Sequence, residues 1–147
     1  MNFALNRKLG NIYKNVIGTV PVTVAAGVRN GVAIDRRVSG SLAMGLTLAA
    51  SIGAETGSPS ARTFDAKVQD SADGSTGWAD YIPPDQATVA AIAQLTAVST
   101  IAEVDVNLEG AKRYVRVVDT LAFTGGSTPT AGIQSTVQLY GFDRTPQ

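Results

Sequence analysis

The sequence predicts an all-β fold: an antiparallel β-sandwich or jelly roll of about eight strands, with an extended N-terminal arm. Apolar and polar residues alternate in several short runs, most regularly from Thr63 to Gln69, as in strands that turn one face towards a core. Turn sequences such as Asp73-Gly74 separate these runs. No crossover helix is evident between them, so the strands are expected to pair antiparallel.

The chain divides into a short N-terminal segment and one domain, because 147 residues suffice for a single core. Residues 1–20 are interpreted as an N-terminal arm or an edge strand, and residues 21–147 as the β-sandwich domain, with Pro21 at the boundary. The first segment contains three basic residues and no acidic one. The candidate contacts with a partner all lie in it: Phe3, Leu5, Arg7, Lys8, Ile12, Tyr13 and Lys14.

Two strands are predicted between Val32 and Ile52, separated by Ser39-Gly40. In the second, apolar side chains are expected on one face, namely those of Leu42, Met44, Leu46, Leu48, Ala50 and Ile52. The opposite face carries only small residues, namely Ala43, Gly45, Thr47, Ala49 and Ser51. Another layer is therefore expected close against that face, either from the same chain or from a neighbouring subunit.

Two hairpins and a final strand complete the predicted fold. Residues 63–69 should pair with a returning strand at 78–82, and residues 104–108 with a strand at 113–119. The last strand is predicted to end at Gly141. The stretch from Gln86 to Val98 is compatible with a helix or with extension, and its threonines favour strand and loop.

Composition narrows the function classes. The 12 Lys and Arg residues balance 12 Asp and Glu residues, so no global field attracts nucleic acid or a membrane. His and Cys are absent, which excludes catalytic triads and most zinc or iron sites. We find no phosphate-binding glycine loop, no long apolar segment and no signal-peptide core. A protein without catalytic activity, cofactor, metal or signal-directed export is expected.

Acidic residues offer two candidate sites, each with a simpler structural alternative. A first group around the 63–80 hairpin suggests a Ca²⁺ site, but turn formation and solvated strand faces explain it better: Asp65, Asp70, Asp73 and Asp80. A second group resembles glycosidase carboxylates, but alternate residues on a wet strand face are usually just solvated: Glu103, Asp105 and Glu109.

Basic and aromatic residues offer two more candidate sites. Lys112, Arg113 and Arg116 could bind polyanions, but ion pairs with Glu103 or Asp105 on the preceding strand are favoured. Trp78 could stack on a sugar ring, but a single Trp beside a turn more often covers the edge of a core.

Two stretches carry a family resemblance. Residues 67–80, KVQDSADGSTGWAD, followed by residues 104–117, VDVNLEGAKRYVRV, resemble capsid decoration (cement) proteins of tailed phages with a jelly-roll fold, such as that of a Bordetella podophage. The similarity covers about residues 32–145. The same stretches also resemble discoidin-like carbohydrate-binding sandwiches, and Gly77 before Trp78 departs from both patterns.

The phage resemblance implies a structural virion protein without an active site. Such a protein is made in the bacterial host cytoplasm, binds the major capsid protein on the outer capsid surface and stabilises the coat-protein lattice. It implies a homo-oligomer, either a dimer or a trimer, that binds neither nucleic acid nor membrane. The second resemblance implies the alternative function, a carbohydrate-binding module.

Overall fold

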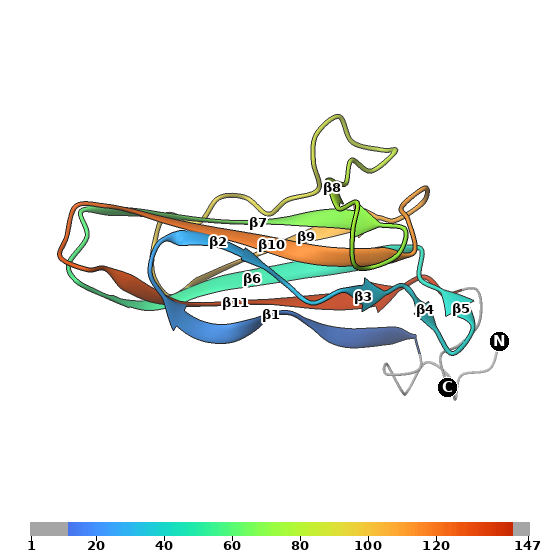
Figure 1. Ribbon diagram of the computed structural model, residues 1–147, viewed down its shortest axis with the longest axis horizontal. Helices are drawn as coiled ribbons and strands as arrows, with labels where there is room; N and C mark the ends of the chain where they lie inside the picture. The colour runs from blue at the N-terminus through green and yellow to red at the C-terminus, as the bar shows by residue number, and fades with distance from the viewer. Residues whose placement is uncertain (1–11, 143–147) are drawn as a thin grey trace.

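The computed structural model describes residues 12–142, and every regular element in this range is a β-strand (Figure 1). The longer strands are β1 (Tyr13–Val24), β2 (Gly27–Asn30), β6 (Gly45–Thr56), β7 (Ala61–Ser71), β9 (Thr100–Asn107), β10 (Tyr114–Thr124) and β11 (Thr130–Tyr140). Four strands have two residues each: β3 (Ile34–Asp35), β4 (Arg37–Val38), β5 (Ser41–Leu42) and β8 (Ala79–Asp80). In the described range, no helix is long and apolar enough to cross a membrane.

The strands form two antiparallel sheets packed as a sandwich, which confirms the predicted fold class. The four-stranded sheet has the order β1-β11-β6-β9. The second sheet has the order β2-β10-β7-β8, with β3 also paired to β10, and β4 pairs with β5 separately. The described residues form eleven strands, more than the predicted eight or so, because the two-residue strands are too short to show a periodic pattern.

The core lies between the two sheets and follows the alternation of the sequence. Phe64, Ala66 and Val68 of β7 are buried as predicted, with exposures of 0–1 %. They face buried leucines of β6, Leu46 and Leu48, across the sandwich. Strict alternation on both sheets thus produces one continuous apolar layer.

The alternation changes phase just before β6, where the prediction was wrong. Ala43 is completely buried, whereas Met44 is 41 % exposed. The reason is that β5 and β6 are separate strands: Ala43 and Met44 connect them, and the amide of Ala43 donates to the carbonyl of Arg36. A single strand from Leu42 to Ile52 would have buried Met44 instead.

The predicted hairpin of residues 104–108 with 113–119 is also wrong. β9 pairs with β6 in one sheet, and β10 pairs with β7 in the other. The turn at Glu109-Gly110 therefore carries the chain from one sheet to the other. Alternating strands joined by a short turn fit either arrangement, so the pattern alone could not separate them. The predicted return after residues 63–69 does form, but it pairs only as β8, at Gln69 and Asp70.

β1 is the edge strand of the four-stranded sheet, paired with β11 from Tyr13 to Val24. The predicted boundary between residues 20 and 21 falls inside this strand. Pro21 coincides with an irregularity in the strand, because the pairing register shifts between Thr19 and Val22. Proline has no N–H to donate, which an edge strand with a bulge tolerates.

The ambiguous stretch from Gln86 to Val98 contains no helix, in line with the favoured interpretation. It runs beside β7 and forms two isolated bridges, Lys67 with Ala91 and Phe64 with Leu95. Backbone hydrogen bonds from Ile92 to the carbonyl of Ala66 and from Leu95 to that of Phe64 hold it there. It therefore covers the edge of the second sheet beyond β8.

Candidate functional site

The predicted partner-contact residues are only partly described. Phe3, Leu5, Arg7 and Lys8 lie outside the described residues. Ile12 is 44 % exposed and directly precedes β1. Tyr13 pairs with Tyr140 and Lys14 with Leu139 at the start of β1. Tyr13 and Lys14 therefore lie at the start of the edge strand β1, and Ile12 directly precedes it.

The acidic residues of the 63–80 hairpin are each held by a different partner. Asp65 accepts hydrogen bonds from Gln94, and Asp80 accepts from Lys67 and Gln69. The carboxylate of Asp70 lies 3.2 Å from the ammonium of Lys112. Among residues 12–142 there is no group of three or more acidic side chains arranged to hold a metal ion. The acidic residues thus act separately in the surface of the sheet.

Asp73 organises the turn that follows β7. Its carboxylate accepts hydrogen bonds from the backbone amides of Ser75 and Thr76 and from the hydroxyl of Thr76. These donors favour the charged form and hold the pKa of Asp73 far below its ordinary range. Gly74 adopts a φ of 76°, which suits glycine at this turn. The turn-forming interpretation accounts for all these contacts.

The basic residues before and within β10 do not pair with Glu103 or Asp105, contrary to the prediction. Lys112 contacts Asp70, and Arg113 binds Asp35. The guanidinium of Arg116 donates to the side-chain oxygen of Gln69 on β7, at 2.7 Å. The reason is topological, since β9 and β10 belong to different sheets.

Trp78 lies partly buried beside the Asp73 turn, with one ring face occupied. The guanidinium carbon of Arg116 is 4.4 Å from the centroid of the indole, in a cation–π contact. A sugar that stacked on this face would have to displace Arg116. This placement agrees with the interpretation of Trp78 as a cover over the edge of the sheet.

An apolar edge that was not predicted from the sequence lies on the side of the sandwich where β1 and β2 are the outermost strands of their sheets. Five apolar residues on these strands and the adjoining segment are 42–66 % exposed; together we call them the apolar edge: Ile17, Val20, Val22, Val28 and Val32. The amide of Val32 donates to the carbonyl of Gly18, so the two edge segments lie side by side. The signal in the sequence that could have indicated this edge is its run of β-branched residues, all of them Ile or Val.

Behind the apolar edge lies a buried polar network that joins the sheets. Asp119 on β10 is fully buried and accepts from the hydroxyl of Thr19 and from Arg29, the latter at 3.0 Å. The hydroxyls of Thr19 and Ser135 are 2.7 Å apart. Burial raises the pKa of Asp119, although these donors oppose the shift. Among residues 12–142, the other carboxylate oxygen of Asp119, Oδ1, has no hydrogen-bond partner.

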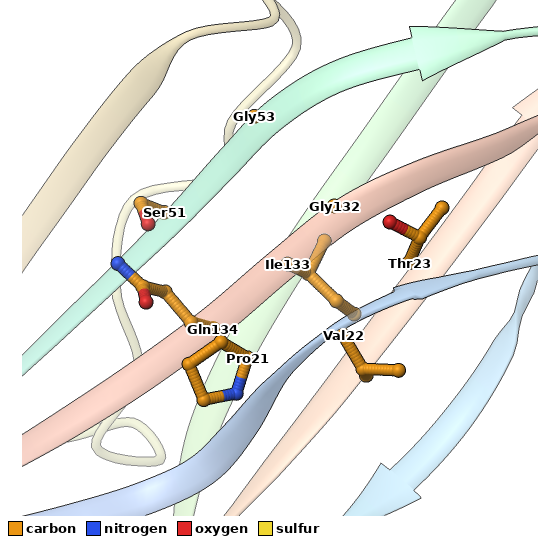
Figure 2. A pocket seen from close by; sticks show the side chains of 8 residues that line it. All are labelled: Pro21, Val22, Thr23, Ser51, Gly53, Gly132, Ile133 and Gln134. Atoms are coloured by element: carbon orange, nitrogen blue, oxygen red, sulfur yellow. The ribbon is translucent and has the colours of Figure 1, made fainter.

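The face of the four-stranded sheet that points away from the core, here called the outer face, is open. The predicted second layer over Thr47, Ala49 and Ser51 is absent from the described residues, since these side chains remain partly exposed. One hollow of about 400 Å³ on this sheet is lined by Pro21, Ser51, Gln134 and two glycines, Gly53 and Gly132, among others. Figure 2 shows the side chains of Ser51, Gln134 and Pro21 grouped together on this sheet.

A second hollow of about 400 Å³ on the same face is lined by polar groups, including Asn15, Thr136, Gln138 and the carboxylates of Glu103 and Asp105. Thr47 donates a hydrogen bond to Asp105 across strands β6 and β9. The third predicted carboxylate, Glu109, follows β9 in a turn and is not part of this hollow. The three acidic residues are therefore not one catalytic group.

Comparisons with known proteins identify no family for this chain. No protein-family model and no curated protein matches it. Among solved structures, it is similar to the CBM22-1 and GH10 modules of xylanase 10B from Clostridium thermocellum, in complex with xylohexaose. The identity is 10 %, the TM-score is 0.41, and the match covers 89 % of this chain but 26 % of the other.

Proposed function

We propose that this chain is a non-catalytic decoration protein that binds the major capsid protein on the outer surface of a tailed-phage capsid and stabilises the coat-protein lattice. The observation that carries the proposal is the apolar edge. Val20 and Val28 are 59 % and 66 % exposed there, on strands whose outer sides have no partner strand in either sheet. Exposed apolar side chains gathered on edge strands suit attachment to another protein.

The proposed binding mode relies on shape rather than on charge. The chain has no net charge, and its apolar edge consists of exposed β-branched residues on β1, on β2 and just after β2. A weak contact of this kind becomes effective on a capsid because the same site is repeated across the lattice. Arg7, Lys8 and Lys14 belong to the basic N-terminal segment and would add contacts with coat carboxylates.

The resemblance also supports self-association as a dimer or trimer, and a virion location after synthesis in the host cytoplasm. Sedimentation velocity of the purified chain measures the first property. Detection of the chain in purified virions by mass spectrometry measures the second. The alternative function, sugar binding at Trp78, is less favoured because Arg116 occupies one face of that ring.

Co-sedimentation with phage heads tests the proposal. The heads are those of the phage that encodes the chain, stripped of decoration protein. We expect the wild-type chain to pellet with them and Val28→Asp to lose at least about tenfold in affinity, because a charge would enter an apolar contact. Ile101→Asp is the matched control, since Ile101 is 62 % exposed on β9, which forms the edge of the four-stranded sheet opposite to β1.

The outcomes separate the site from the function. Equal losses for Val28→Asp and Ile101→Asp, or no loss for either, would remove the apolar edge as the binding site. Absence of wild-type protein from the pellet would remove the capsid function itself.

A further inference from the structure

The outer face of the four-stranded sheet carries polar side chains in register across all four strands. Asn15 of β1 pairs with Gln138 of β11, Gln138 with Thr47 of β6, and Thr47 with Asp105 of β9. The next row along the strands contains Thr136 and Glu103. Amide, hydroxyl and carboxylate groups thus form a continuous hydrogen-bonding surface.

This surface is partly ordered by its own contacts. Gln138 donates to the side-chain oxygen of Asn15 at 3.1 Å, and the hydroxyl of Thr47 donates to Asp105. Glu103 and Asn15 are exposed, and the carboxylate of Glu103 accepts no hydrogen bond from another described residue. The hollow of about 400 Å³ lies over these residues, so their free donors and acceptors face space that a ligand can fill.

An aromatic ring borders the hydrogen-bonding surface at one end. Tyr140 belongs to the adjoining row, between Tyr13 of β1 and Gly45 of β6. Its ring lies over Gly45, because a Cβ on that glycine would come within 2.7 Å of the ring Cζ. Tyr140 remains partly exposed in this position. A ring that lies across a strand offers its face as a platform.

We propose that the outer face binds a neutral oligosaccharide, with Tyr140 as the stacking platform and Asn15, Gln138, Thr47, Glu103 and Asp105 as hydrogen-bonding groups. Sugar rings combine an apolar face with several hydroxyls, and each of these finds its counterpart here. The two carboxylates accept hydroxyl hydrogen bonds and repel an anionic ligand, and the two rows that line the hollow contain no Lys or Arg. An extended chain of sugars suits the open rows along the strands.

The site adjoins the apolar edge at Ile17, which pairs with Thr136. Its proposed binding groups are other residues, and the proposal does not depend on the proposed capsid function. The site also differs from Trp78, which lies next to β8 of the other sheet. Two half-buried aromatic residues on opposite sheets therefore make a matched pair for mutation.

A glycan array of neutral and acidic oligosaccharides tests the proposal, followed by calorimetric titration with the best neutral ligand. We expect binding to neutral glycans, reduced about tenfold or more by Tyr140→Ala and unchanged by Trp78→Ala. Gly45→Ala should weaken binding as well, because its methyl group must displace the Tyr140 ring. Glu103→Gln should admit acidic glycans that the wild-type chain rejects.

The melting temperature of each variant is measured as a control for folding. If Tyr140→Ala does not fold, Gln138→Ala replaces it as the test of the site. Any of three binding results would overturn the proposal: no binding to any neutral glycan, equal binding by wild type and all outer-face variants, or a loss caused by Trp78→Ala instead. A dimer that Tyr140→Ala converts to a monomer would also overturn it, since a second copy would then occupy the face.

Discussion

The hydroxyl of Thr19 on β1 donates a hydrogen bond to the carboxylate of Asp119 on β10, so one side-chain contact joins the edge of one sheet to the middle of the other. Arg29 on β2 binds the same carboxylate and also donates to the carbonyl of Val20. The two edge strands that carry the proposed capsid contact are thus held together by a buried polar group.

Thr19→Val should lower the free energy of unfolding by about 1–3 kcal/mol, because it removes a donor from a buried carboxylate that already has one unpaired oxygen. Urea denaturation measures the change. Thr23→Val is the matched control on the same strand, since Thr23 is exposed, and it should change stability by less than about 0.5 kcal/mol. Equal effects of the two substitutions would contradict a special role for Thr19.

Asp119→Asn should change how stability depends on pH. Burial raises the pKa of Asp119 above its ordinary 3.8, so the folded chain holds this proton more tightly than the unfolded chain. The resulting stabilisation is present below about pH 4 and is lost as the pH rises through the folded pKa. Asp119→Asn has no titratable group at this position, so its stability does not fall with pH for this reason.

Urea denaturation of both proteins between about pH 4 and pH 7 tests this sign. Relative to Asp119→Asn, the wild type should become less stable as the pH rises. A constant difference across the range would show that the carboxyl group has the same pKa in the folded and unfolded chains.

Arg36 is 2 % exposed and donates to three backbone carbonyls, those of Ala43, Ala111 and Lys112. Arg36→Met should destabilise the fold by at least about 2 kcal/mol, because these acceptors lose their donor. Arg36→Lys should recover only part of the loss, since an ammonium cannot reach several carbonyls in the geometry of a guanidinium. Arg37→Met, at an exposed neighbour, is the control and should be nearly neutral.

Trp78 and Arg116 should be coupled by about 0.5–1 kcal/mol, as expected for a partly exposed cation–π contact. A double-mutant cycle with Trp78→Ala and Arg116→Ala measures this energy by chemical denaturation. Additive effects would mean that the indole is stabilised by other contacts. This prediction also tests whether Trp78 is structural.

Removal of residues 1–11 should leave the sandwich folded and weaken co-sedimentation with phage heads, and high salt should cause part of the same loss. A longer deletion of residues 1–20 should in addition destabilise the fold, because it removes most of the pairing between β1 and β11. Melting temperatures and pelleting separate the two effects. If the chain without residues 1–11 pellets as well as the wild type, the N-terminal arm does not contribute to capsid binding.

The sequence was sufficient to predict the sheets where strict alternation meets a core. β7 is the clearest case, because Phe64, Ala66 and Val68 show the period of a strand with one buried face. Arg36 shows the limit of this reasoning. It shares a face with the buried Ile34, but its buried environment depends on carbonyls distant in the sequence.

Local sequence patterns could not predict which strands share a sheet. The partners of Arg113 and Arg116 are on β3 and β7, because β9 and β10 lie in different sheets. The outer face was noticed only as a row of small residues. Tyr140 becomes part of it through the register of β11 with β6, which no local rule specifies.

The pairing of β1 with β11 has a consequence for synthesis on the ribosome. Asn15 and Gln138 are hydrogen-bonded although they are 123 positions apart, so β1 leaves the ribosome long before its partner strand exists. At about 5–20 residues per second, β1 waits several seconds or more with its apolar side chains exposed. A chain that stops before β11 would leave β1 and β6 without the strand between them, so nascent fragments should need chaperones until the last strand is translated.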